Sequence, residues 1–183
     1  MAVPDCEMLM LPLLRFAAKE GCEVSTGKAV DALASELGLT DADLKEMLPS
    51  GIQSRFVNRV GWASTYMKKA GLLEATRRGL YRITERGEAL LKEQPTAVDV
   101  KLLSRYPEFV EFLQLKGTRS SDRGPESRTA ADASTATPSE TLESAYENLR
   151  SELADDLLGK LKAVSPSFFE RIVVELLVKM GYG

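Results

Sequence analysis

Eight lysine and arginine side chains lie between residues 51 and 90, a stretch with only three acidic residues, although the formal net charge of the whole chain is −3. Guanidinium and ammonium groups gathered in this way can bind phosphates, and arginine can also pair with guanine edges in the major groove of DNA. Residues 1–50 carry the opposite balance, −5. The local cluster therefore says more about binding partners than the mean charge does. Its members are Arg55, Arg59, Lys68, Lys69, Arg77, Arg78, Arg82 and Arg86.

Residues for other kinds of chemistry are scarce. The chain has no histidine and only two cysteines, Cys6 and Cys22, which excludes Ser-His and Cys-His nucleophile pairs and most zinc sites. We therefore predict no catalytic residue, no metal ligand and no cofactor in this chain. The longest apolar run, at 8–14, is far short of the roughly 20 residues that cross a bilayer. With no signal segment and no disulfide framework, we expect a soluble cytoplasmic protein that does not contact membranes.

The helix expected at Ile52–Ala70 carries the only tryptophan, Trp62. At 100° per residue its apolar side chains form one face, and a polar, basic and aromatic stripe lies opposite. Such a stripe suits a major groove, and Trp62 has little reason to be exposed unless it binds something. Two alternatives stay open: a solvated helix face, and a Trp62 covered by the wing or by the appendage expected at 95–116. The residues predicted to contact nucleic acid on this helix are Arg55, Asn58, Arg59, Trp62, Thr65 and Lys69.

The surrounding pattern predicts a mainly α-helical winged helix-turn-helix with a small β-hairpin wing. We expect helices at 4–20, 27–37 and 40–48, with a short extended piece between the first two. After the long helix, two short apolar segments flank a turn at Gly79 and indicate a hairpin, followed by a helix capped by Thr84. Arg77 and Arg78 would lie at the hairpin tip, far from the core, so they are not needed for packing. We expect them to contact phosphates or the minor groove.

We place this winged-helix domain at residues 1–94. The rest of the chain is predicted to form three further segments. Residues 95–116 favour a helical appendage broken at Pro107. Residues 117–138 contain no leucine, isoleucine, valine or aromatic residue, which is typical of a flexible, disordered linker. Residues 139–183 are amphipathic and predict a C-terminal helical segment, with a second helix starting at Ser165-Pro166.

The stretches "NRVGWA", "YMKKAGLLE", "RGLYRITERG" and "YPEF" together resemble the N-terminal domain of the Mrr family of restriction-system proteins, over residues 6–115. The tail "VSPSFFERIVVELLVKMGYG" is similar to the opening of that family's nuclease domain. The resemblance implies a relative of type IV restriction endonucleases, which cut methylated DNA. It also implies that residues 139–183 are a truncated start of the nuclease domain.

For catalysis the resemblance implies an absence. In the family, an acidic residue and a Glu/Gln-x-Lys pair hold a divalent metal on strands that would follow Gly183. Magnesium is thus expected only with a complete nuclease domain. Glu170 could correspond to an accessory acidic position, although a solvent-facing helix glutamate is the simpler interpretation. Glu175 and Lys179 are four residues apart and predict an ion pair along one helix.

These observations lead to one hypothesis and one main rival. The hypothesis is a DNA-binding module that recruits a nuclease to foreign, methylated double-stranded DNA, with the catalytic core absent from this chain. The rival is a non-catalytic winged-helix regulator or protein–protein interaction module, in which the acidic first 50 residues and the amphipathic tail serve self-association, for example as a homodimer.

Overall fold

The computed structural model describes residues 3–118 and 136–182. The chain divides into two compact units, Met1–Thr141 and Leu142–Gly183. Most of the stretch expected to be a linker, 117–138, falls outside the described residues.

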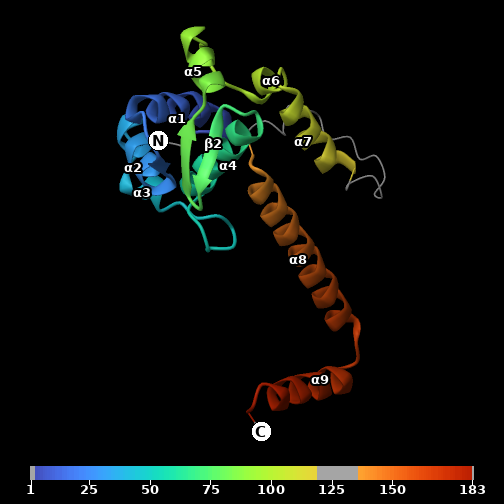
Figure 1. The fold of residues 1–183 in the computed structure, drawn as a ribbon. Coiled ribbons are helices and arrows are strands. Elements are labelled where there is room, and N and C mark those ends of the chain that lie inside the picture. Colours follow the sequence, from blue (N-terminus) through green and yellow to red (C-terminus); the bar gives the residue numbers. More distant parts are fainter. Residues whose placement is uncertain (1–2, 119–135, 183) are drawn as a thin grey trace. The chain divides into compact units, whose positions relative to one another are not determined.

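The first unit begins with four helices, coloured blue to green in Figure 1. They are α1 (Cys6–Glu20), α2 (Thr26–Glu36), α3 (Asp41–Leu44) and α4 (Arg55–Lys69). Ser25 caps α2 by accepting a hydrogen bond from the Lys28 amide, so the helix begins one residue before the range 27–37 that was expected. Thr40 caps α3 in a reciprocal capping box with Asp43. These helices occur in the expected order.

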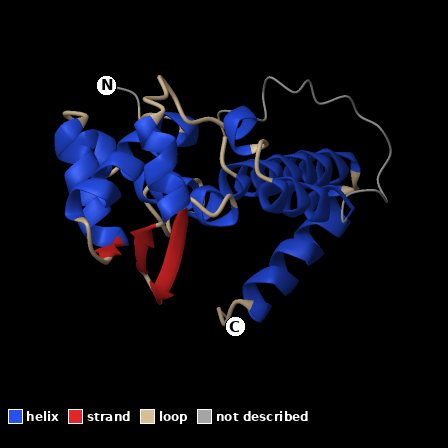
Figure 2. Ribbon diagram, turned by 45° about the horizontal axis from the view of Figure 1, so that its top comes forward, coloured by secondary structure: helices blue, strands red, loops and turns tan. Residues whose placement is uncertain are grey.

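A three-stranded antiparallel sheet completes the domain, and Figure 2 shows it as one small group of strands beside the helices. Its strands are β1 (Val24–Ser25), β2 (Leu73–Arg77) and β3 (Leu80–Ile83), in the order β1-β3-β2. The hairpin turns at Gly79, whose φ of 75° suits a residue without a side chain. The short extended piece between α1 and α2 pairs with β3 through Val24 and Tyr81. The mainly helical chain with this small sheet is consistent with a winged-helix-like fold, as the sequence predicted.

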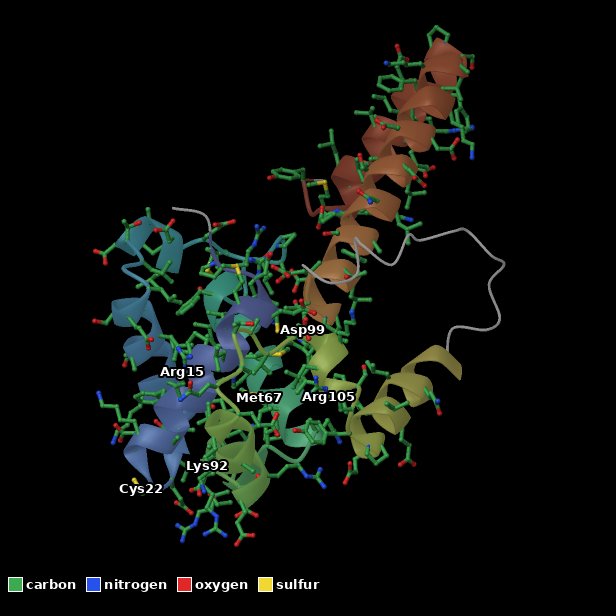
Figure 3. The ribbon with its side chains drawn as sticks, turned by 90° about the horizontal axis from the view of Figure 1, so that it is seen from above. Arg15, Cys22, Met67, Lys92, Asp99 and Arg105 are labelled. Carbon is green, nitrogen blue, oxygen red and sulfur yellow. The ribbon has the colours of Figure 1, made fainter. Side chains whose placement is uncertain are left out.

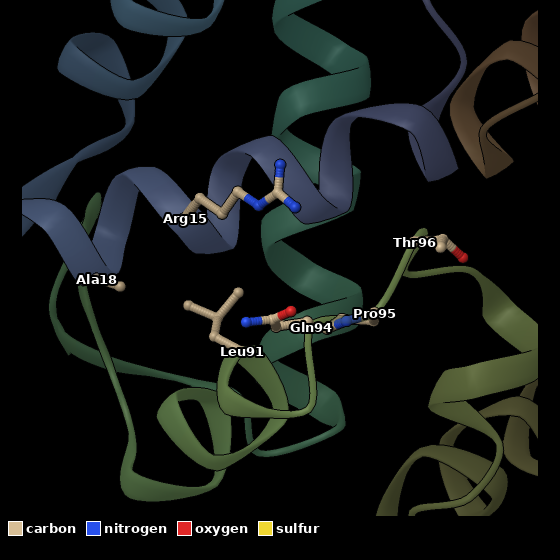
Figure 4. Close-up of a pocket in the computed structure, with 6 residues that line it drawn as sticks. All are labelled: Arg15, Ala18, Leu91, Gln94, Pro95 and Thr96. Atoms are coloured by element: carbon tan, nitrogen blue, oxygen red, sulfur yellow. The ribbon is translucent and has the colours of Figure 1, made fainter.

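The core of the first unit is built around α4. Phe56, Val60, Ala63 and Met67 follow the predicted apolar face and are all fully buried. They pack against α1, whose Leu9, Leu13 and Leu14 are also fully buried. Figure 3 labels Met67 inside this packed region, whereas Cys22 lies at its surface.

Three further helices follow the hairpin: α5 (Glu85–Lys92), α6 (Val100–Leu103) and α7 (Pro107–Thr118). Thr84 caps α5 by accepting from the Gly87 amide, as expected. The helical appendage is interrupted just before Pro107, because α6 ends at Leu103 and α7 begins at Pro107. It is held to α4 by aromatic contacts, because Tyr66 meets the ring of Phe109 edge-on at 5.7 Å and that of Phe112 at 6.2 Å.

The C-terminal helical segment consists of α8 (Pro138–Ala163) and α9 (Pro166–Lys179). Helix α9 begins at the Ser165-Pro166 pair, with proline at the start of the helix. No side chain of α9 is buried, and Phe169, Leu176 and Met180 are among its exposed apolar residues. Within residues 3–118 and 136–182, no helix combines the length and apolarity needed to cross a membrane.

Candidate nucleic-acid interface

The tip of the wing carries Arg77 and Arg78, and both side chains are exposed. The tip is tied to the start of α2, because Thr26 donates to the Gly79 carbonyl from its backbone amide at 3.0 Å and its hydroxyl at 3.3 Å. Neither arginine has an acidic partner among the described residues. Two charged groups without counterions are thus held on an anchored turn.

The start of α2 adds positive potential at the same place. Its first turn contains no acidic residue, and both Gly27 and Lys28 are exposed. The first amides of a helix carry a partial positive charge that favours anions. Sequence reasoning did not include Lys28, although the run Ser25-Thr26-Gly27-Lys28 at a helix start could have indicated it.

Two other arginines of the basic stretch are neutralised by neighbours. Arg82 pairs with Glu74 across the hairpin. Arg86 pairs with Glu108 at 3.2 Å and donates to the Ala70 carbonyl at 3.0 Å. Of the hairpin arginines, Arg77 and Arg78 at the wing tip therefore keep positive charges that no such partner balances.

On α4, two of the predicted residues lie on an open face. Thr65 is half-buried and its hydroxyl donates to the Gly61 carbonyl at 2.9 Å; apart from the chain neighbours of Gly61 and the backbone of α4, no heavy atom lies within 4 Å of where a Cβ on Gly61 would be. Lys69 is exposed, with its Nζ 5.4 Å from the centre of the Phe112 ring. Next to it, burial lowers the pKa of Lys68, whose Nζ lies 5.7 Å from the centre of the Tyr81 ring.

The other four predicted residues of α4, Arg55, Asn58, Arg59 and Trp62, contact the first turn of α8. Asn58 is only 6% exposed, because its side-chain oxygen accepts from the Thr137 hydroxyl at 2.7 Å. The Trp62 indole N–H donates to the Ser139 hydroxyl at 3.0 Å. The helical period correctly placed these residues away from the apolar core, but it did not show that another segment of the chain covers them.

Arg59 is the most enclosed of the four, at 9% exposed. Its Nε donates to Glu140 at 3.0 Å, and its Nη1 donates to the carbonyl oxygens of Val3 at 2.7 Å and Pro4 at 3.0 Å. The carboxylate of Asp5 lies 3.3 Å from the same nitrogen. Arg59 thus joins the start of α1 to the start of α8.

Arg55 lies between two carboxylates. Its Nη1 is 2.8 Å from Glu46, and its Nε is 3.5 Å from Glu140. Glu140 is therefore held by two guanidinium groups. The arrangement neutralises a carboxylate that is only 7% exposed.

The first turn of α8 is fixed by a capping box that sequence reasoning missed. The Thr137 amide donates to Glu140 at 2.7 Å, the Glu140 amide donates to the Thr137 hydroxyl at 3.2 Å, and Pro138 is the first helical residue. Thr137 is 1% exposed, so this last part of the predicted linker is packed on α4. The run Thr-Pro-Ser-Glu is a recognisable helix start, and it was the available sign.

Acidic residues elsewhere do not converge. Across the described ranges, there is no group of three or more cysteine, aspartate or glutamate side chains that could hold a metal ion. Glu170 lies exposed on α9.

This architecture defines a class of protein in which a winged-helix-like domain with a basic wing is followed by a helical segment. Residues 7–93 match the family model of the Mrr N-terminal domain. The chain is 31% identical over 196 residues to the type IV methyl-directed restriction enzyme EcoKMrr of Escherichia coli (strain K12). That match covers 100% of this chain and 61% of the relative. No solved structure matches. Together these matches support an Mrr-family restriction protein.

Proposed function

We propose that this domain binds double-stranded DNA through the wing tip and the start of α2. The observation that carries the proposal is the contrast among the arginines: Arg82 and Arg86 are paired with carboxylates, whereas Arg77 and Arg78 are exposed without an acidic partner among the described residues. Exposed arginines on a wing, beside a helix start with Lys28, offer several positive groups to successive phosphates. We assign Thr65 and Lys69 on α4 to the same role.

We further propose that DNA binding by this domain directs a restriction nuclease to foreign, methylated DNA in the cytoplasm. The support is family membership, because the relative is a methyl-directed restriction enzyme. The chain spans 61% of that relative's length. Our proposal assigns cleavage and its magnesium requirement to a complete nuclease domain. The described residues contribute binding.

The proposal is tested by titrating a fluorescently labelled duplex with the full chain and following anisotropy. Replacing Arg77 and Arg78 together by alanine should weaken binding about tenfold or more, since each charge-assisted contact contributes roughly 1 kcal/mol. The matched control is Lys101→Ala with Arg105→Ala, which removes the same charge from two exposed residues outside the wing. Equal weakening in both variants would show that only net charge matters and would overturn the assignment to the wing.

A second candidate function, as a protein-interaction module, is favoured by the exposed apolar side chains of the C-terminal segment. Leu142, Leu149 and Leu153 on α8 are each more than half exposed. Sedimentation of the full chain distinguishes the two functions: concentration-dependent self-association without any DNA binding would favour the second candidate.

A further inference from the structure

The first turn of α8 and its capping residue, together Thr137–Thr141, lie on the same face of α4 that sequence reasoning predicted to read DNA. We propose that this turn is an intramolecular latch that occupies the face in the free protein and leaves it when DNA binds. The inference rests on the proposed DNA-binding function and adds a regulatory contact to it. All the contacts that define the latch lie within the unit Met1–Thr141.

The latch presents to α4 the same chemical groups that DNA would present. The Glu140 carboxylate lies on the guanidinium groups of Arg59 and Arg55, where a phosphate could bind. The Thr137 hydroxyl donates a hydrogen bond to the side-chain oxygen of Asn58, an atom that could otherwise accept a hydrogen bond from a base edge. Because the turn covers the atoms of Arg59, Arg55 and Asn58 that DNA would contact, the latch and DNA cannot occupy this face at the same time.

The latch is small enough to open without unfolding the domain. Only the first turn of α8 belongs to the first unit. Its capping box is internal, between Thr137 and Glu140, so the turn can remain helical when it leaves α4. Arg59 would keep Asp5 and the carbonyl oxygens of Val3 and Pro4 as partners. Only open molecules can bind DNA on this face, so the apparent association constant equals the intrinsic constant multiplied by the fraction of molecules that are open.

Trp62 makes the latch observable, because it is the only tryptophan of the chain and its indole N–H donates to Ser139. Opening should expose the indole to water, shift its emission to longer wavelength and increase its quenching by acrylamide. Adding duplex DNA to the full chain should also change this emission, since DNA replaces the latch on α4.

The test compares two double variants of the full chain. Thr137→Val with Glu140→Gln removes the latch hydroxyl and the latch charge. Ser144→Ala with Glu147→Gln removes a hydroxyl and one negative charge from exposed positions further along α8, and serves as the control. Circular dichroism checks that both variants keep the helical content of the parent chain.

We expect the latch variant to show shifted Trp62 emission without DNA and to bind duplex DNA about tenfold more tightly than the control, as a closed population of about 90% would require. Unchanged emission would overturn the latch, because Thr137 and Glu140 would then not hold the turn on α4. Shifted emission with equal or weaker DNA affinity would also overturn it, leaving a permanent structural clasp and the proposed function intact. Absence of DNA binding by parent, control and variant alike would refute the proposed function itself, and the latch with it.

Discussion

Replacing Arg59 by alanine should destabilise the first unit by about 3 kcal/mol. The side chain bonds two backbone carbonyl oxygens, those of Val3 and Pro4, and pairs with the nearly buried carboxylate of Glu140. Each carbonyl bond contributes about 1 kcal/mol, and loss of the enclosed pair adds roughly another 1 to 2 kcal/mol. The partial compensation by Arg55, 3.5 Å from Glu140, keeps the total at the lower end of the range for buried pairs.

The assay is urea unfolding followed by Trp62 fluorescence, which reports only on the first unit because the chain has a single tryptophan. A double-mutant cycle with Glu140→Ala isolates the pair, and we expect a coupling of about 1 kcal/mol or more between the two positions. Arg82→Ala is the control, since its pair with Glu74 is exposed and should contribute less than about 1 kcal/mol. A loss below about 1 kcal/mol for Arg59→Ala, or no coupling to Glu140, would show that the enclosed pair does not hold these segments together.

Three further predictions concern other parts of the first unit. Gly87→Ala should destabilise the first unit by about 1 to 3 kcal/mol in thermal unfolding, because a Cβ at this position would meet the Leu72 carbonyl oxygen. Gly61→Ala on α4 is the control, because a Cβ there has room, and it should be neutral or stabilising by up to about 1 kcal/mol. Burial raises the pKa of Cys6 to about 12, so a thiol reagent at pH 8 should label only the exposed Cys22 until denaturant is added, and rapid labelling of both cysteines in the folded chain would contradict this. Burial also raises the pKa of Tyr81 from 10.0 to about 12, so the contribution of the neutral phenol to stability is complete below pH 10 and is lost as pH rises toward 12. Tyr81→Phe should therefore flatten the pH–stability curve between pH 10 and 12. The variant should cost little stability at neutral pH, because the Tyr81 hydroxyl has no hydrogen-bond partner among the described residues.

The elements of the fold could be predicted from sequence because their causes are local. The apolar side chains of α4 recur at helical spacing, Thr84 caps α5, and Gly79 makes the hairpin turn, so each is visible within a short window. The extra strand β1 was visible only as a short extended piece. Its pairing with β3 joins Val24 to Tyr81, which are far apart in the sequence.

The state of the candidate site could be predicted only in part. Helical periodicity separates the apolar face of α4 from its polar face, but a polar stripe looks the same whether water or another segment covers it. Asn58 and Thr137 are 79 positions apart, and Arg59 and Glu140 are 81 apart. Only the Thr-Pro-Ser-Glu capping box hinted that a helix begins at Thr137, and nothing local to it indicates α4 as its partner.

The most direct test of the central claim, that the wing tip binds the DNA backbone, is the dependence of duplex affinity on salt concentration. The logarithm of the binding constant should fall linearly with the logarithm of salt concentration for the full chain, because bound lysine and arginine release counterions. Replacing Arg77 and Arg78 by alanine should reduce the slope by about 2, close to 0.9 for each lost phosphate contact. A slope near zero for the full chain, or an unchanged slope in the double variant, would contradict the account.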